Sequence, residues 1–186
     1  MVPLFKHRLP GYVALYSAVF VIFLAVGYIL HHRILAVLMP SVNASVAAVG
    51  AVEKAGGNLP AILALAIFVK NALVAVLVLT FGKRLFGAFP AFVLAVNALV
   101  LGAVYGDTVS SGTPWSEAAL YFVPHGVIEI PALVAACVLA VRGTLKERLL
   151  NGAKYLAVPL ALAALVEVYV TPALLEIVWA AKRIAA

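Results

Sequence analysis

Five apolar stretches, each close to the length that crosses a membrane, constrain this chain more than any other feature. About 20 mostly apolar residues suffice for a spanning helix. Lipid offers no partners for backbone polar groups, and no alternating pattern supports a barrel, so we expect every span to be a helix. The stretches are roughly Tyr12–Leu30, Ala61–Phe81, Ala88–Tyr105, Phe122–Val141 and Tyr155–Val170, the last extendable through Trp179. The sequence predicts an all-α, polytopic transmembrane bundle, with residues 1–186 forming a single integral membrane domain.

Composition agrees with a lipid environment. Hydrophobic residues make up 66% of the chain and charged residues 11%, whereas soluble domains carry about 25% charged residues. The 13 Lys and Arg residues are scattered at the ends of the spans and do not gather on one face. We therefore expect the lipid bilayer as the main partner and no nucleic-acid binding.

The basic residues also predict an orientation. Arg33, Lys54, Lys182 and Arg183 fall on one side of the membrane, and Lys182 and Arg183 argue mildly against the assignment that follows. The other side carries more basic residues, namely Lys6, Arg8, Lys83, Arg84, Arg142, Lys146, Arg148 and Lys154. The positive-inside rule then predicts a multi-pass protein of the cell membrane with a cytoplasmic amino terminus and, after five spans, an external carboxyl terminus.

Two connections are long enough to form short interfacial helices. Ser41–Ala55 is rich in Ala and Val, and Asn58 is a plausible cap for the span that follows it. Trp115–Tyr121 carries aromatic residues suited to headgroup depth. We expect Thr113 to cap this second helix and Pro114 to occupy its first position.

Several polar side chains lie inside the apolar stretches. Charged groups at the centre of a bilayer cost about 2.5–3.5 kcal/mol each on insertion scales, so they are candidates for function. From their positions along the spans, Lys70, Glu129 and Glu167 are expected in the outer half of the membrane, within about two helical turns of a common level. The predicted polar cluster comprises Lys70, Asn71, Asn97, His125, Glu129 and Glu167.

The segment from Pro124 to Pro131 concentrates this polarity. His125 and Glu129 are four residues apart, so a helix stacks them on one face. Gly126 leaves a gap beside them, and Pro131 frees the carbonyl of a residue one turn earlier. An imidazole, a carboxylate and an open space therefore coincide within two turns.

The charges of the cluster leave three functional alternatives. With one lysine and two glutamates ionised, the cluster carries one unbalanced negative charge. Protonated His125, one protonated glutamate or a bound cation would balance it, which corresponds to a structural pair, a proton relay or a metal site. His125 and Glu129 give fewer ligands than zinc or iron normally takes, and Glu167 is the candidate for a third. No cofactor other than such a metal is expected.

Small residues recur every four positions in the third span. Ala98, Gly102 and Gly106 form a small-xxx-small face that lets helices approach closely. This face predicts either packing within the bundle or a seam between two copies of the chain.

Four segments resemble the stage II sporulation protein M family of integral membrane proteins, from about the second span to Pro172. They are Pro124-His-Gly-Val-Ile-Glu-Ile-Pro131, Lys70–Asn71, Asn97–Leu101–Gly102 and Val166-Glu-Val-Tyr-Val-Thr-Pro172. The resemblance implies that His125, Glu129 and Glu167 are the family's polar positions, with Asn71 and Asn97 matching its asparagines. It also implies partners among membrane or envelope proteins, because the sporulation member resembles an anchor for peptidoglycan-degrading proteins.

Three functions follow as hypotheses. The first is a non-catalytic scaffold or permease-like component whose polar cluster organises the bundle or binds a partner or solute. The alternative is an ion- or proton-coupled transporter subunit that uses the cluster. The third is an intramembrane metal-dependent hydrolase, although the chain contains no phosphate-binding loop, HExxH or GxSxG motif. We expect no enzyme activity.

Overall fold

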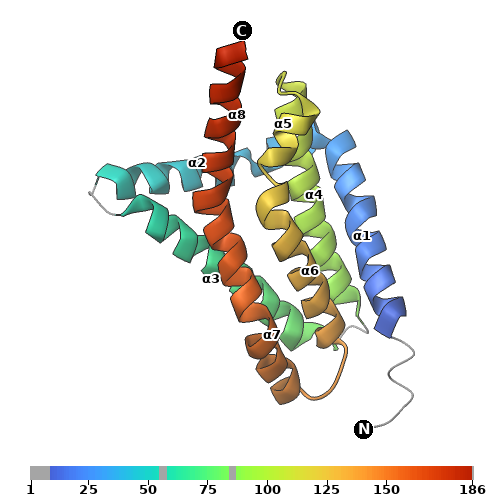
Figure 1. The fold of residues 1–186 in the computed structure, drawn as a ribbon. Helices are drawn as coiled ribbons and strands as arrows, with labels where there is room; N and C mark the ends of the chain where they lie inside the picture. Colours follow the sequence, from blue (N-terminus) through green and yellow to red (C-terminus); the bar gives the residue numbers. More distant parts are fainter. Residues whose placement is uncertain (1–8, 55–57, 84–86, 186) are drawn as a thin grey trace.

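The computed structural model describes residues 9–54, 58–83 and 87–185, and all regular structure within these ranges is helical (Figure 1). The helices are α1 (Leu9–Ile29), α2 (His31–Lys54), α3 (Leu59–Phe81), α4 (Ala88–Ser110), α5 (Trp115–Leu120), α6 (Val123–Ala140), α7 (Leu145–Leu165), the π-helical turn η2 (Val166–Val170) and α8 (Thr171–Ala185).

The five predicted spans are confirmed among the described residues, although the fifth begins at Leu145 and not at the predicted Tyr155. Five helical segments are long and apolar enough to cross a membrane, and the fifth is a continuous rod of 40 residues that covers α7, η2 and all of α8 but its last residue. Their bounds are Pro10–Ile29, Leu59–Phe81, Ala88–Ser110, Val123–Ala140 and Leu145–Ile184. The start of α1 and the end of α8 lie at opposite ends of the bundle, as an odd number of spans requires (Figure 1).

The connecting helices differ in detail from the prediction. The cap of α3 is confirmed, because the backbone N–H of Ala61 donates to the side chain of Asn58 at 3.3 Å. The short helix α5 also forms, but Pro114 occupies its N-cap and no side chain caps it, so the prediction of a Thr113 cap was wrong by one residue. The turn-forming sequence before Pro114 stays outside the helix.

The first connecting helix is longer than expected. α2 begins at His31, immediately after a turn at Leu30 whose carbonyl accepts from the N–H groups of Arg33 and Ile34. The prediction started this helix at Ser41 and missed the earlier turns, where apolar residues continue the helix up to Pro40. α2 lies across the bundle (Figure 1). The predicted end at Ala55 falls outside the described residues.

Close packing of α1 against α4 forms one side of the bundle. A Cβ placed on Gly102 would lie 2.1 Å from the carbonyl oxygen of Leu24, and one on Gly27 would lie 2.3 Å from that of Leu99. Ala98 on the same face of α4 is fully buried. The small-residue face is therefore used for packing within the chain, and a seam between two copies stays a prediction.

The far end of the long rod is tied to α5. Lys182 forms an ion pair with Glu117, and the indole Nε1 of Trp179 donates to the other carboxylate oxygen of Glu117 at 2.5 Å. These two contacts fix α8 beside the short helix after it leaves the main bundle (Figure 1). We call Glu117, Trp179 and Lys182 the α5–α8 latch.

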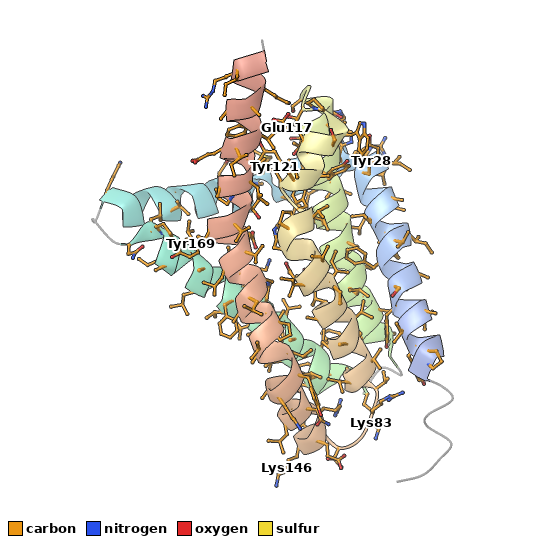
Figure 2. The ribbon with its side chains drawn as sticks, in the orientation of Figure 1. Tyr28, Lys83, Glu117, Tyr121, Lys146 and Tyr169 are labelled. Carbon is orange, nitrogen blue, oxygen red and sulfur yellow. The ribbon has the colours of Figure 1, made fainter. Side chains whose placement is uncertain are left out.

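Basic residues mark one end of the bundle. Lys83 and Lys146 lie at the end where α1 begins, whereas Tyr28 and Glu117 lie at the other end (Figure 2). This arrangement agrees with the sidedness of the charges, and the cytoplasmic orientation stays a prediction. Lys6, Arg8 and Arg84 lie outside the described residues.

The close contact of α1 and α4 predicts that Gly102→Ala destabilises the protein. The added methyl group would collide with the backbone carbonyl of Leu24, and overpacking of this kind costs about 1–3 kcal/mol. We expect a lower unfolding temperature in thermal melts of the detergent-purified protein. Gly11→Ala is the matched control, because nothing lies within 4 Å of a Cβ at that helical position. Equal melting temperatures for the two variants would contradict the packing described.

The latch predicts a pH effect on α8. Hydrogen bonds from Lys182 and then from Trp179 lower the pKa of Glu117 below the ordinary glutamate value. Because this pKa is lowered, the stabilising contribution of Glu117 is present above the ordinary pKa and is lost as the pH falls through the lowered one. In a Trp115→Phe background, the fluorescence of Trp179 should stay constant down to the ordinary glutamate range and change only below it. Glu117→Gln should show the changed spectrum already at neutral pH, and a wild-type transition at or above the ordinary range would contradict this pairing.

Candidate functional site

The first part of the site lies near the beginning of α6. Pro124 occupies the first turn, where its missing N–H costs nothing, and the helix continues through Pro131. His125 and Glu129 lie one turn apart on the same face, as their spacing predicted. His125 is 8% exposed and Glu129 is partly buried.

The second part lies on the π-helical turn in the long rod. η2 covers Val166–Val170 and includes Glu167, between the regular helices α7 and α8. A π turn inserts an extra residue into the hydrogen-bond ladder and changes the direction of the side chains on it, and such turns are frequent at functional sites. Glu167 is partly buried.

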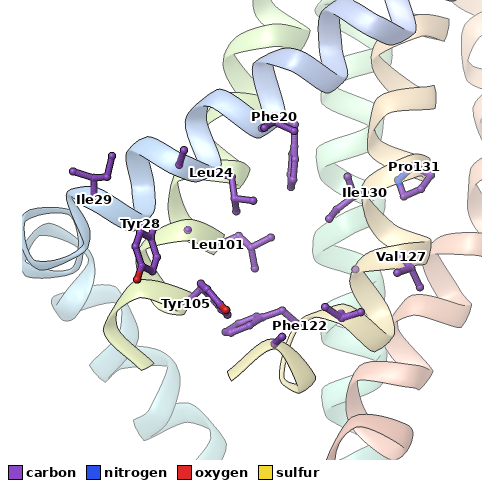
Figure 3. Close-up of a pocket in the computed structure, with 16 residues that line it drawn as sticks. Phe20, Leu24, Tyr28, Ile29, Leu101, Tyr105, Phe122, Val127, Ile130 and Pro131 are labelled. Atoms are coloured by element: carbon purple, nitrogen blue, oxygen red, sulfur yellow. The ribbon is translucent and has the colours of Figure 1, made fainter. Parts of the chain in front are cut away.

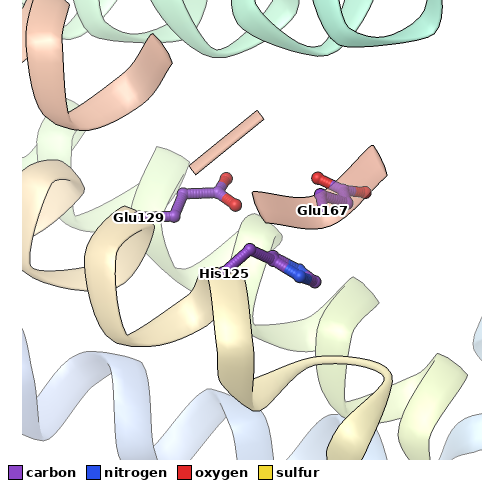
Figure 4. Close-up of side chains that lie close together, drawn as sticks. All are labelled: His125, Glu129 and Glu167. Atoms are coloured by element: carbon purple, nitrogen blue, oxygen red, sulfur yellow. The ribbon is translucent and has the colours of Figure 1, made fainter. Parts of the chain in front are cut away.

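The fold brings these two parts together. The imidazole of His125 and the carboxylates of Glu129 and Glu167 each offer a ligand atom, and these atoms all lie within 4.8 Å of one another. The close-up shows His125 and Glu129 on α6 and Glu167 on the neighbouring rod (Figure 4). Glu167 thus joins His125 and Glu129 although it lies 38 positions after Glu129 in the chain, and we call the three residues the His–Glu–Glu cluster.

The cluster lines a cavity of about 390 Å³ between the helices. Lys70 from α3 and Asn97 from α4 line the same cavity, so the structure brings five of the six predicted polar residues together. The sixth, Asn71, is 3% exposed and is not among the lining residues. The amide of Asn97 donates to the carbonyl oxygen of Val93 at 2.8 Å and so has a partner within its own helix.

The polar groups of the cluster make no hydrogen bond and no ion pair within the part of the chain that the structure describes. Among the described residues, no hydrogen bond or ion pair engages His125, Glu129 or Glu167, and the Nδ1 atom of His125 is buried without a partner. Buried polar groups are normally satisfied. A structural pair that fixes helix register would show a hydrogen bond or an ion pair, and the described residues show none for these three side chains.

A larger apolar cavity lies beside the polar one. Its volume is about 910 Å³, and it is bounded by α1, α4, α5 and α6 (Figure 3). Both cavities are lined by Phe20, Leu101, Phe122, Gly126 and Ile130. A Cβ at Gly126 would touch only Ile130, at 3.5 Å, so this glycine leaves open space at the boundary of the two cavities.

Sequence reasoning missed three structural contributors. One is the π turn around Glu167, because local sequence does not distinguish a π turn from an α-helix. Another is Phe20 of α1, an apolar residue in an apolar span that lines both cavities. The third is Arg148, which was assigned only to the charge count but is 7% exposed and donates to the carbonyl oxygen of Ala140 at 2.9 Å. The available signal was the Thr144–Glu147 capping box, which marks the beginning of the helix that carries Arg148.

These features define a class of multi-pass helical membrane proteins with a partly buried polar cluster between their helices. The model of the family described as Stage II sporulation protein M matches residues 16–172, and the chain belongs to this family. The resemblance inferred from the sequence is thus confirmed, and it extends further back, into the first span. No curated protein and no solved structure matches the chain.

The unpaired cluster predicts how its variants affect stability. Glu129→Gln and Glu167→Gln each remove a charge that is costly to hold in a low-dielectric interior. We therefore expect their unfolding temperatures in detergent to equal or exceed that of the wild type. Arg148→Met provides the comparison, because it strands the buried carbonyl of Ala140 and should cost about 1–3 kcal/mol. Glutamine variants with unfolding temperatures as low as that of Arg148→Met would show that the carboxylates stabilise the bundle.

Proposed function

We propose that this protein is a non-catalytic, permease-like membrane component that takes up a cation or a proton at the His–Glu–Glu cluster. One observation carries the proposal: ligand atoms from α6 and η2 lie within 4.8 Å of one another, yet no described residue of the chain pairs with them. Groups arranged in this way suit reversible binding of a ligand.

The charges in the cavity support the same proposal. The partly buried Glu129 and Glu167 contribute two negative charges when ionised, and Lys70, which is exposed but lines the cavity, contributes one positive charge. One negative charge then remains inside the bundle, where the cost of an uncompensated charge is high. A bound cation or a proton on the cluster offsets it.

The position of the cluster also suits exchange across the membrane. The cavity is lined by residues of α1, α3, α4, α6 and η2, so it lies where several spans meet. Secondary transporters commonly bind their substrates at helix interfaces, beside interrupted helices. In this chain the departure from a regular α-helix is the π turn that contains Glu167, and the rod stays helical through it.

A scaffold is the second candidate, supported by the long rod. α7, η2 and α8 run continuously, and the α5–α8 latch holds the distal end outside the main bundle (Figure 1). Such an exposed helix suits contacts with membrane or envelope proteins. No specific observation favours a metal-dependent hydrolase over these two candidates.

Flux in proteoliposomes tests the proposal. The wild type should carry protons or divalent cations along a gradient, read by an internal pH dye or an internal chelating dye. Glu129→Gln and Glu167→Gln should abolish this flux, because each removes a cluster charge. Glu176→Gln is the matched control, since it changes an exposed glutamate further along the same rod.

The outcome separates the two candidates. Flux that is lost in the two cluster variants and retained in the control supports the permease-like role. A wild type without flux of either kind, or with flux equal to that of the cluster variants, would refute that role. Crosslinked envelope partners that are lost in the Glu117→Ala variant would then favour the scaffold.

A further inference from the structure

We infer that the His–Glu–Glu cluster binds a divalent transition metal of the zinc class, through one imidazole nitrogen of His125 and one carboxylate oxygen each of Glu129 and Glu167. This inference rests on the proposed function in taking the cluster as the place where a cation enters. It goes further by naming the ion class and the three ligands. The three ligand atoms lie within 4.8 Å of one another.

The environment of His125 is the second, independent observation. The side chain is 8% exposed, lines the polar cavity, and has a buried Nδ1 atom without a partner among the described residues. Imidazole nitrogens in membrane interiors need a hydrogen bond or a metal to offset their lost hydration. A metal in the cavity supplies that missing interaction.

The backbone around each ligand is a third observation. Glu129 precedes Pro131 within a continuous helix, and Glu167 lies on the π turn. The turn re-aims Glu167 while the rod on both sides of it stays helical. The ligands are therefore presented by two rigid elements, which is how precise sites are built.

The donor set selects the type of ion. Magnesium and calcium are bound through oxygen ligands alone, whereas an imidazole nitrogen suits zinc, iron, nickel and copper. Zinc bonds of about 2.0–2.2 Å place tetrahedral ligands roughly 3.5 Å apart, so ligand atoms that now lie up to 4.8 Å apart must approach one another by up to about 1.3 Å. Three protein ligands also leave one position open for water or an exchanging ligand.

Lys70 modulates the site without belonging to it. Its side chain lines the same cavity but an ammonium group cannot ligate a metal, and its positive charge opposes a bound cation. The amide of Asn97 is engaged by the carbonyl of Val93 and is not a ligand. Lys70→Met should therefore tighten metal binding, which a purely structural Lys–Glu pair would not do.

Metal titration of the purified protein tests the inference. The full chain is prepared without a histidine tag, stripped of metal, and titrated with Zn²⁺ against a chromophoric chelator. We expect one Zn²⁺ per chain. Even the loss of a residue that only supports a metal ligand weakens affinity about 10–100-fold, so His125→Ala, Glu129→Gln and Glu167→Gln should each weaken binding by about 100-fold or more. The controls His32→Ala and Glu176→Gln change exposed residues and should leave affinity unchanged.

Cobalt keeps the inference testable if a variant fails to fold. Co²⁺ bound to the wild type should give the visible absorption of a four- or five-coordinate site, and excess Zn²⁺ should remove it. No Zn²⁺ binding above that of Glu129→Gln, or displacement of Zn²⁺ by equimolar Mg²⁺, would overturn the inference.

Its failure and that of the proposed function are distinguishable. Stoichiometric Zn²⁺ that depends on the three ligands, without flux in liposomes, supports the metal site and refutes the permease-like role. Proton flux that depends on Glu129 and Glu167, without Zn²⁺ binding, supports the permease-like role and refutes the metal site.

Discussion

Every backbone polar group of a membrane-spanning chain must find its partner within the protein, and this constraint shapes the whole bundle. It explains why the regular structure in the described ranges is helical, and why the five apolar stretches became spans. It also makes interruptions costly. Two of the departures from a regular ladder, Pro131 in α6 and the π turn Val166–Val170, lie beside members of the His–Glu–Glu cluster. The regular pattern of backbone hydrogen bonds is thus broken next to the polar side chains of the cluster.

The same low dielectric gives the cluster its importance. Two carboxylates and an imidazole share a small cavity without partners from the described part of the chain. The small-residue seam of Gly27 and Gly102 brings α1 against α4, and Phe20 of α1 thereby lines the polar cavity. The packing of α1 against α4 therefore closes one side of the site. The apolar cavity on the other side of Phe20 and Ile130 adjoins the membrane-facing surface, because Val21 and Val127 line it and are largely exposed.

Much of the fold could be predicted from the sequence, because spans are set by local hydropathy and by length. The polar residues of the site were also visible, since charge inside an apolar run is rare. The sequence could not show which polar side chains lie close together. Lys70 lines the cavity but its neighbour Asn71 does not, because the rotation of α3 about its axis decides which side chains face the cavity. The early start of α2 at His31 was missed because its first turns contain no cap signal, and the Thr113 cap was displaced by Pro114. The contact of Arg148 could not be predicted because its acceptor, Ala140, belongs to another helix.

The claim that the His–Glu–Glu cluster is a cation site is tested most directly by diffraction from crystals grown with Zn²⁺, measured on both sides of the zinc absorption edge. The claim predicts one strong anomalous peak per chain, at about 2.0–2.2 Å from the imidazole nitrogen of His125 and from carboxylate oxygens of Glu129 and Glu167. An empty cluster in which the ammonium group of Lys70 pairs with the two carboxylates would contradict it. The cluster would then be a structural ion pair within the bundle.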